Sequence, residues 1–288
     1  MLKQRLLTAA IMIPLLLASV IWLPATYFAI FIGIISIIGA WEWAGFMQLS
    51  FPSQKIIYVT VFVVALGICW FVTSKFLDTA FYILLASMIW WLCALLLIFS
   101  FPKHTELCGY KIVSGIIGLM VLVPCWLSIA TLHNNYEHGI QLVIYLFAVI
   151  AVADSGAYFG GRLLGRTKLA PRVSPGKSWE GVLSGLISVG ILAYFSDAIV
   201  LRQSLDGYSI GIFIGITLLT AAFSIVGDLN ESMFKRRVSL KDSGLILPGH
   251  GGVLDRIDSM TAAAPLFAIC IRWFLGPDSY LLPLQSPY

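Results

Sequence analysis

Long apolar runs broken by short polar segments dominate this chain of 288 residues. Most of these runs are long enough to cross about 30 Å of hydrocarbon as α-helices. The pattern predicts about nine membrane spans, near residues 6–22, 27–46, 57–73, 80–100, 112–131, 140–160, 181–200, 209–227 and 258–275. Because Pro24 separates the first two runs by only a few residues, they form either a tight helical hairpin or one long kinked segment.

The composition agrees with this pattern. Apolar residues make up 59% of the chain, charged residues 11%, and the mean hydropathy is +0.94. These values lie far from those of soluble domains and predict an all-α, polytopic integral membrane protein. The five cysteines show no C-x-x-C spacing, which indicates packing residues rather than a zinc site or a disulfide framework.

The basic residues gather on one side of the predicted spans. With the N-terminus in the cytoplasm, all of the 18 Lys and Arg residues except Lys75, Arg202 and Arg272 fall at the cytoplasmic side. The two richest loops, 161–180 and 228–257, then share that face. The pattern predicts a bacterial-type inner membrane protein with a cytoplasmic N-terminus. No A-x-A-like site follows the first run, which indicates an uncleaved first helix.

The two halves of the chain differ in character. Residues 1–130 have spans almost free of ionisable groups and are interpreted as scaffold helices, whereas residues 131–288 form a catalytic region with both basic loops. Glu42, between Trp41 and Trp43, is the chief exception in the first half. We interpret it as a hydrated carboxylate at the headgroup level, with a role in the site as the alternative.

Asp154 is the first acid that breaks the apolar pattern of the second half, in the segment ADSGAY with Ser155. A carboxylate near the end of a span costs a few kcal/mol unless a partner or a water-filled cavity relieves it. Arg162, two turns further on, could neutralise it at the interface. We favour the other interpretation, in which Asp154 is not simply neutralised by Arg162 but lies in or beside a functional site.

A second polar segment, Ser-Pro-Gly-Lys-Ser at residues 174–178, precedes the span near residue 181. Pro and Gly free the backbone from helix, Lys177 supplies a point charge, and the N–H groups of the following helix face an anion. Ser174 and Lys177 are therefore candidates for binding phosphate. The spacing is not that of a P-loop, and a basic loop against anionic headgroups is the alternative.

Three acids border the last polar loop. Asp228 closes one predicted span, while Asp255 and Asp258 open the next and project from one helix face. Carboxylates from neighbouring helices form a hard-oxygen pocket suited to Mg²⁺, which also binds substrate phosphates. An ordinary helix cap would explain Asp255 alone.

Between these acids lie Lys235, Arg236 and Lys241, followed by Pro-Gly-His-Gly-Gly at residues 248–252. Acids, bases and glycines in alternation fit a polyphosphate held by a metal on one side and by cations on the other. Gly251 and Gly252 would let the backbone approach the phosphates closely. The excess of cytoplasmic Lys and Arg in membrane proteins explains the bases alone, but not the glycines and acids.

The segment SMFKRRVSLKDSGLILPGHGGVLDRID, residues 232–258, resembles the signature of phosphatidate cytidylyltransferases, also called CDP-diacylglycerol synthases. The segments GDLNES, ADSGAY and VSPGKSWEG resemble the same family. The resemblance covers about residues 150–260, whereas the earlier spans share only number, hydrophobicity and WEW. The signature positions are occupied by Ser232, Lys235, Arg236, Lys241, Asp242, His250, Gly251, Gly252, Asp255, Arg256 and Asp258.

The resemblance implies transfer of a cytidylyl group from CTP to phosphatidic acid, which gives CDP-diacylglycerol and pyrophosphate. It also implies Mg²⁺, with a second cation such as K⁺ beside it. The expected partners are CTP, phosphatidic acid and membrane lipids, without nucleic acid, and a homodimer is compatible with the sequence. The implied metal ligands are Asp228, Asp255 and Asp258; the implied substrate-binding residues are Asp154, Ser155, Ser174, Lys177, Gly251 and Gly252.

The remaining signature residues are expected to be catalytic. Lys235, Arg236 and Lys241 would neutralise the triphosphate and the departing pyrophosphate. His250 would donate to a phosphate oxygen, or instead make a structural hydrogen bond in the glycine turn. Asp242 has a salt bridge to a neighbouring base as its alternative, and Arg256 would orient the acids beside it.

Three other classes share some of these features. A polyprenyl-phosphate sugar-phosphate transferase would need paired adjacent aspartates, which we do not find. The D-G-x-x-A-R head of CDP-alcohol phosphotransferases does not occur either. A transporter would usually place its ionisable groups near the membrane midplane, whereas here they gather at one face.

Overall fold

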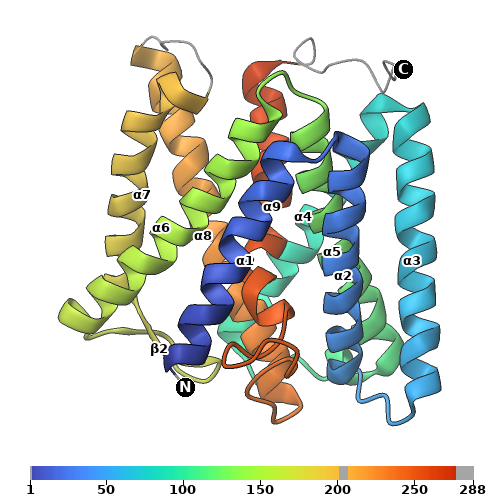
Figure 1. Cartoon of the computed structure of the whole chain (residues 1–288). Coiled ribbons are helices and arrows are strands. Elements are labelled where there is room, and N and C mark those ends of the chain that lie inside the picture. Colours follow the sequence, from blue (N-terminus) through green and yellow to red (C-terminus); the bar gives the residue numbers. More distant parts are fainter. Residues whose placement is uncertain (1, 201–206, 277–288) are drawn as a thin grey trace.

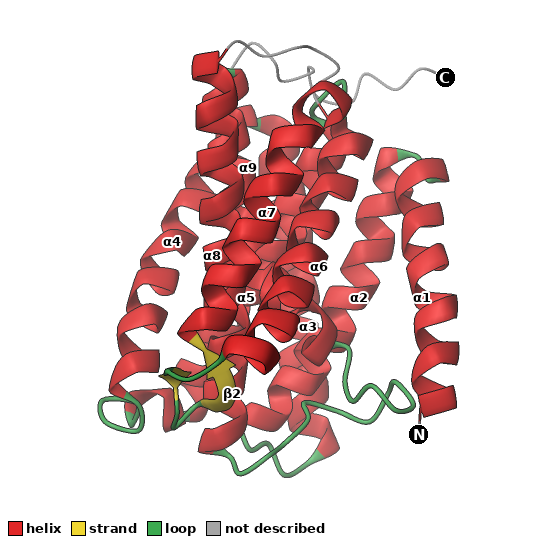
Figure 2. Cartoon of the chain, turned by 90° about the vertical axis from the view of Figure 1, so that its left-hand side faces the viewer, coloured by secondary structure: helices red, strands yellow, loops and turns green. Residues whose placement is uncertain are grey.

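The computed structural model describes residues 2–200 and 207–276, in which nine α-helices stand side by side (Figures 1 and 2). Arg202 lies outside the described residues. The helices are α1 (Leu2–Trp22), α2 (Ala25–Phe46), α3 (Pro52–Lys75), α4 (Leu77–Ser100), α5 (Lys111–Asn134), α6 (Gly139–Leu164), α7 (Trp179–Val200), α8 (Gly207–Arg237) and α9 (Leu254–Leu275). A 3₁₀ turn, η1 (Leu107–Gly109), precedes α5, and the strands β1 (Lys168–Ala170) and β2 (Ser174–Ser178) form a hairpin between α6 and α7.

Eight of the described helices are long and apolar enough to cross a membrane, and the apolar part of α1, Leu6–Trp22, is shorter. A helix pairs all of its inner backbone N–H and C=O groups, which hydrocarbon requires. Large apolar side chains such as Leu96, Leu163 and Trp273 are exposed on the outside of the bundle, as in a protein surrounded by lipid. The predicted all-α, polytopic membrane fold is confirmed.

The first two runs form a helical hairpin, as one of the two alternatives predicted. α1 ends at Trp22 and α2 begins at Ala25. Pro24 has φ −55° and ψ 150°, and its carbonyl accepts the first hydrogen bond of α2 from the N–H of Phe28 at 2.9 Å. Since proline has no N–H to lose and a fixed φ, it suits the position just before a helix.

α5 lies inside the bundle and packs against α2, α3, α4, α6 and α9. α8 and α9 pack along each other, and so do α6 and α7. The second pair is brought together by small residues: a Cβ at Gly185 would lie 2.7 Å from the Ala153 carbonyl oxygen, and one at Gly160 would overlap with Ser184. Glycine therefore allows the backbones of these two helices to approach closely.

The polar segments of the second half meet at one end of the bundle, the lower end in Figure 1. The β-hairpin, the ends of α6 and α8 and the loop 238–253 all lie there, together with the N-terminus (Figures 1 and 2). The two basic loops therefore lie on the same side of the bundle, as predicted.

Two helix ends close to the polar segments extend beyond the predicted spans. α6 continues to Leu164 and α8 continues to Arg237, so both polar loops are shorter than expected. Asp228 therefore lies inside α8 rather than at its end, and Lys235 belongs to the last turns of that helix. The hydropathy pattern marks where the chain leaves hydrocarbon, whereas a helix continues for as long as its backbone stays paired.

Candidate functional site

Lys177 and Asp228 form an ion pair at the polar end of the bundle. Lys177 Nζ lies 2.7 Å from Asp228 Oδ2, and Ser232 Oγ, one turn along α8, donates to Asp228 Oδ1 at 3.3 Å. Lys177 is held in β2, whose end pairs with β1 through Ser178 and Lys168. The predicted phosphate-binding segment is thus a short hairpin that brings its lysine against a membrane helix.

Asp154 faces the same ion pair from α6. Its carboxylate interacts electrostatically with Lys177, Asp228 and Arg256. Arg162, which could have neutralised Asp154, instead donates to Tyr158 Oη at 3.3 Å. Asp154 therefore lies beside the ion pair of Lys177 and Asp228 rather than against Arg162, and its role in a functional site stays a prediction. Ser155 follows it on α6 and is exposed.

Asp258, on α9, lies beside the carboxylate of Asp228. Its Oδ1 accepts from the backbone N–H of Ser259 at 2.7 Å, and its carboxyl interacts with those of Asp228 and Glu231. Glu231 was not among the predicted residues, although it lies in the GDLNES segment. Helices α6, α8 and α9 thus contribute the carboxylate cluster, which we define as Asp154, Asp228, Glu231 and Asp258.

Glu231 is buried among these acids. Its Oε2 accepts from Lys235 Nζ at 2.7 Å, one turn along α8. No donor among the described residues reaches its Oε1, which is buried as well. A buried carboxylate oxygen without a donor is costly unless a cation or water satisfies it.

Asp255 shares Lys235 with Glu231 of the carboxylate cluster, and its other oxygen is held by the loop 238–253. Its Oδ1 accepts from Lys235 Nζ at 2.6 Å, and its Oδ2 accepts from Ser243 N at 2.9 Å, Ser243 Oγ at 2.9 Å and Gly252 N at 2.8 Å. Of the three predicted metal ligands, Asp228 and Asp258 interact, whereas Asp255 is occupied by the loop. Within the described ranges, no three His, Cys, Asp or Glu side chains already stand in metal-binding geometry.

The Gly-His-Gly-Gly segment forms a tight turn. His250 N donates to the Leu247 carbonyl at 2.9 Å, and Leu247 pairs with Gly251 across an isolated bridge. Gly251 has φ +83°, which favours glycine, and a Cβ there would lie 2.8 Å from Asp255 Oδ2. Gly251 thus lets the loop pack on the Asp255 carboxylate. The approach of Gly251 and Gly252 to a substrate phosphate stays a prediction.

The other predicted residues surround this core. Arg236 Nε donates to the Val173 carbonyl at 3.2 Å and so joins α8 to the β-hairpin, on which Ser174 begins β2. Lys241, Asp242 and Arg256 are exposed. The ion pairs among the described residues do not include Asp242, and His250 Nδ1 is buried with no hydrogen-bond partner in those ranges.

Glu42 is the residue whose surroundings differ most from the prediction. Only 4% of it is exposed, so it is not a hydrated carboxylate at the headgroup level. Its oxygens accept from Val253 N at 3.0 Å, Leu254 N at 2.7 Å and Ser243 Oγ at 3.2 Å. The flanking tryptophans misled the prediction, because Trp43 is itself buried rather than interfacial.

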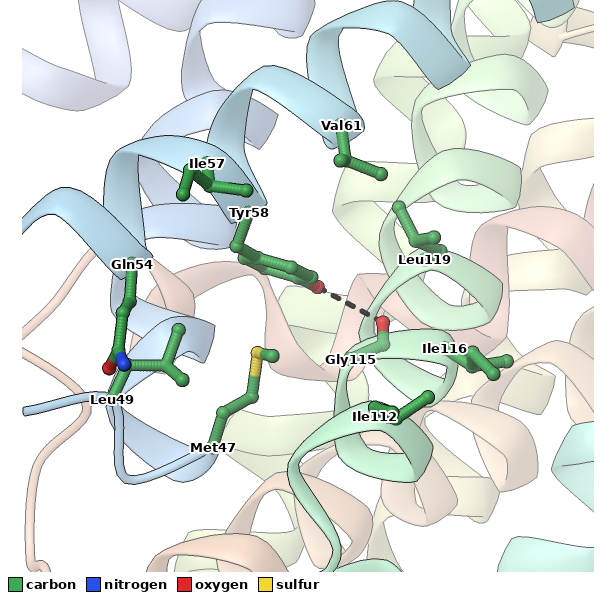
Figure 3. A pocket seen from close by; sticks show the side chains of 10 residues that line it. All are labelled: Met47, Leu49, Gln54, Ile57, Tyr58, Val61, Ile112, Gly115, Ile116 and Leu119. Carbon is green, nitrogen blue, oxygen red and sulfur yellow. Dashed lines mark hydrogen bonds between the residues drawn. The ribbon is translucent and has the colours of Figure 1, made fainter.

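Two further pockets lie in the first half of the chain, on opposite sides of α3. One, of about 370 Å³, opens between α3 and α5 and is shown in Figure 3. Tyr58 Oη points across it and donates to the Gly115 carbonyl at 3.3 Å, while Met47, Ile57 and Leu119 supply apolar walls. The other is lined by α2, α3 and α5 and is apolar as well. Neither lining offers charged groups for phosphate chemistry.

The chain is similar to known proteins along almost all of its length. The model of the cytidylyltransferase family matches residues 3–274. A phosphatidate cytidylyltransferase of Haemophilus influenzae is 40% identical over 93% of this chain and 98% of its own length. One of Pseudomonas aeruginosa is 40% identical over 96% of this chain and 98% of its own length, and one of Brucella suis is 40% identical over 53% of this chain and 54% of its own.

Proposed function

Because this chain belongs to the cytidylyltransferase family and transfers a cytidylyl group from CTP to phosphatidate, we propose that the transfer takes place at the carboxylate cluster and Lys177. The products are CDP-diacylglycerol and pyrophosphate. The observation that carries the placement is the ion pair between Lys177 and Asp228, with Asp154 and Asp258 beside it. Acids and a base from four separate elements meet there at one end of a membrane bundle.

The chemistry makes modest demands on the side chains. A phosphate oxygen of phosphatidate attacks the α-phosphorus of CTP, a new P–O bond forms, and the bond from the α-phosphorus to the oxygen of the β-phosphate breaks as pyrophosphate leaves. A phosphate monoester is already an adequate nucleophile. The protein therefore has to align the two substrates and to stabilise the negative charge that they bring together.

Lys177 is the base best placed for this task. It is half-buried, and its partner in the structure is a carboxylate rather than a phosphate. A substrate phosphate offers the same kind of oxygen to Lys177 and would take the place of Asp228. Arg256 and Lys241, both exposed at the same end, would hold the more distant phosphates. Lys235 is engaged by Glu231 and Asp255 and would orient these two acids.

A divalent cation fits the carboxylate cluster on chemical grounds. The donors are hard carboxylate oxygens, Asp228 and Asp258 carry like charges that interact, and Glu231 Oε1 is buried without a donor in the described ranges. Asp228 and Asp258 would hold the ion, with Asp154 and Glu231 beside them. When bound, Mg²⁺ would neutralise phosphate charge and favour departure of pyrophosphate. A second cation such as K⁺ stays a prediction.

The protein is an integral membrane protein. We place it in an inner membrane with its N-terminus in the cytoplasm, because this orientation puts the basic end of the bundle on the side where CTP is available. The polar cluster would then lie at the membrane surface, within reach of a lipid headgroup. A homodimer and the lack of a nucleic-acid partner stay predictions.

The placement of the reaction is tested by comparing a variant of an acid in the cluster with a variant of an acid far from it. Purified protein with CTP, phosphatidate and Mg²⁺ should release pyrophosphate, and Asp258→Asn should lower kcat by two or more orders of magnitude. Glu137→Gln, an exposed acid in the loop between α5 and α6, should leave kcat unchanged. Near-normal turnover by a correctly inserted Asp258→Asn protein would remove the cluster from the reaction.

A further inference from the structure

A carboxylate from the first half of the chain holds the start of α9. Glu42 projects from the last turns of α2 and receives the N–H groups of Val253 and Leu254 at 3.0 and 2.7 Å. The first N–H groups of any helix lack partners within the helix, and a carboxylate is the anion that satisfies them best. Glu42 therefore acts as a cap for α9, although more than 200 residues separate the two in the sequence.

The local sequence of α9 leaves this position open. Val253 stands at the N-cap, and its side chain cannot accept a hydrogen bond. Asp255, in the first turn, accepts from Gly252 N, which precedes the N-cap, and from Ser243 of the loop. The N–H groups of Val253 and Leu254, which lie between Gly252 and Asp255, donate to Glu42. Glu42 thus supplies the cap that the local sequence of α9 lacks.

Two glycines of the loop make room for the Glu42 carboxylate. A Cβ at Gly252 would lie 2.5 Å from Glu42 Oε2, and a Cβ at Gly244 would overlap with Oε1. No real Cβ stands this close to another atom, so either the Glu42 carboxylate or the loop would have to shift, and the contact between them would change. This close fit explains why glycine stands at positions 244 and 252 without any contact to substrate.

Ser243 links Glu42 to the acids of the site. Its hydroxyl lies 3.2 Å from Glu42 Oε2 and 2.9 Å from Asp255 Oδ2, and its N–H donates to the same Asp255 oxygen. Asp255 continues to Lys235, which continues to Glu231. A chain of direct contacts thus runs from α2 to the carboxylate cluster.

α2 itself is anchored at this level. Trp43 Nε1 donates to the Ser114 carbonyl of α5 at 2.9 Å, and the Trp43 ring lies 4.9 Å from the ring of Phe234 on α8. Gly39, one turn earlier, packs on Leu254 of α9. The backbone beside Glu42 is therefore fixed against three helices, and the carboxylate has a defined position from which to hold the loop.

We propose that Glu42 is a positioning residue for cytidylyl transfer, which fixes the loop 238–253 and the start of α9 so that Asp255, Lys235 and the carboxylate cluster keep their arrangement. Glu42 touches no reacting group. The inference rests on the proposed placement of the reaction at the carboxylate cluster, and its test therefore needs one measurement on the loop and another on turnover.

The first measurement is tryptic cleavage after Lys241, an exposed residue of the loop. In the folded protein Glu42→Gln should be cut there about ten times faster than the parent, because an amide cannot accept from all three donors without a clash between its own N–H groups and theirs. Fragments 1–241 and 242–288 report this cut by mass. Glu106→Gln, an exposed acid between α4 and α5, is the matched control and should be cut at the parent rate.

The second measurement is turnover at saturating substrates. Glu42→Gln should lower kcat about 10²-fold, since displacing a reacting geometry by about 1 Å costs this much. The KM for CTP should change by less than about threefold, because the phosphate-binding bases remain. Parent-like cleavage, or faster cleavage with a normal kcat, would overturn the proposal. Asp258→Asn tests the placement itself, so the two failures remain distinct.

Two more variants keep the proposal testable if Glu42→Gln does not insert. Gly252→Ala adds a Cβ that crowds both Ser243 Oγ and the Glu42 carboxylate, and should push the loop from Glu42. Ser243→Ala removes the hydroxyl that lies between Glu42 and Asp255 and leaves the backbone N–H contact to Asp255 in place. Each variant should speed cleavage and lower kcat. Gly45→Ala is the matched glycine control, since a Cβ there meets no atom within 4 Å. The double variant Glu42→Gln/Gly252→Ala should be no worse than the poorer single one, whereas additive losses in kcat would show that the residues act separately.

Discussion

Lys177 Nζ and Asp228 Oδ2 are 2.7 Å apart, which joins the β-hairpin between α6 and α7 to the middle of the polar part of α8. Both side chains are partly exposed, with 25% and 28% of their surface accessible, so substrate can reach them. A base that is neutralised by an acid before substrate arrives can change partners when a phosphate enters.

Replacing Lys177 should damage substrate binding more than folding. In Lys177→Met the phosphate that replaces Asp228 has no cation, and kcat/KM should fall about 10²-fold or more, as when one charge-stabilising donor is removed from an active site. Steady-state kinetics with both substrates measures this loss. Lys168→Met, an exposed lysine on the neighbouring strand, is the control. A Lys177→Met enzyme as active as this control would refute the role of the ion pair.

Asp255 and Asp258 should respond differently to Mg²⁺. Asp258→Asn should raise the Mg²⁺ concentration needed for half-maximal activity, because a ligand of the ion is lost. Asp255→Asn should leave this concentration unchanged but speed tryptic cleavage after Lys241, because its carboxylate holds the loop. Mg²⁺ titration of both variants is the measurement, repeated with Na⁺ in place of K⁺ to test the second cation. A Mg²⁺ shift in Asp255→Asn alone would reverse the assignment.

The contact between α6 and α7 should depend on a glycine. Gly160→Ala places a Cβ onto Ser184, and the overlap should lower the free energy of unfolding by about 1–3 kcal/mol. Ser184→Gly removes both overlapping atoms and should restore much of the loss. Thermal unfolding in detergent compares these variants with Gly211→Ala, whose Cβ meets nothing within 4 Å. An undisturbed Gly160→Ala protein would contradict the close approach of the two helices.

The orientation in the membrane can be read by cysteine labelling. In a background without native cysteines, Lys168→Cys and Lys241→Cys should both react with an impermeant reagent only from the cytoplasmic side. Glu137→Cys, in the loop at the opposite end of the bundle, should react only from outside. Labelling of the first two positions from different sides would be incompatible with one composite site.

Much of the fold was predictable, because hydrocarbon leaves the backbone few choices. Long apolar runs become helices, and the nine α-helices of the described residues, eight of them long enough to span a bilayer, were all anticipated, including the hairpin at Pro24. The ends of α6 and α8 were not. The last turns of α8 carry Lys235, Arg236 and Arg237, and α6 ends with Gly-Gly-Arg-Leu-Leu, so the apolar pattern weakens before either helix ends.

The identities of most candidate site residues were also predictable, since acids, bases and glycines stand out against an apolar background. Their partners were not. Asp255 was grouped with Asp228 and Asp258 because of its spacing along α9, yet it turns to Ser243 and Gly252. Spacing places side chains on a helix face, but the donors that surround each carboxylate decide what it does.

Glu42 and Glu231 are two further acids whose surroundings the sequence did not predict. In the sequence, Glu42 stands between two tryptophans and looks interfacial, and Glu231 is one of several acids near a helix end. In the fold, the partners of Glu42 arrive from residues 243, 253 and 254, and Glu231 meets Asp258 of another helix. Local composition was enough for the helices and the chemical class. Burial and hydrogen bonding of these acids required donors from distant segments, which come together only when the helices pack.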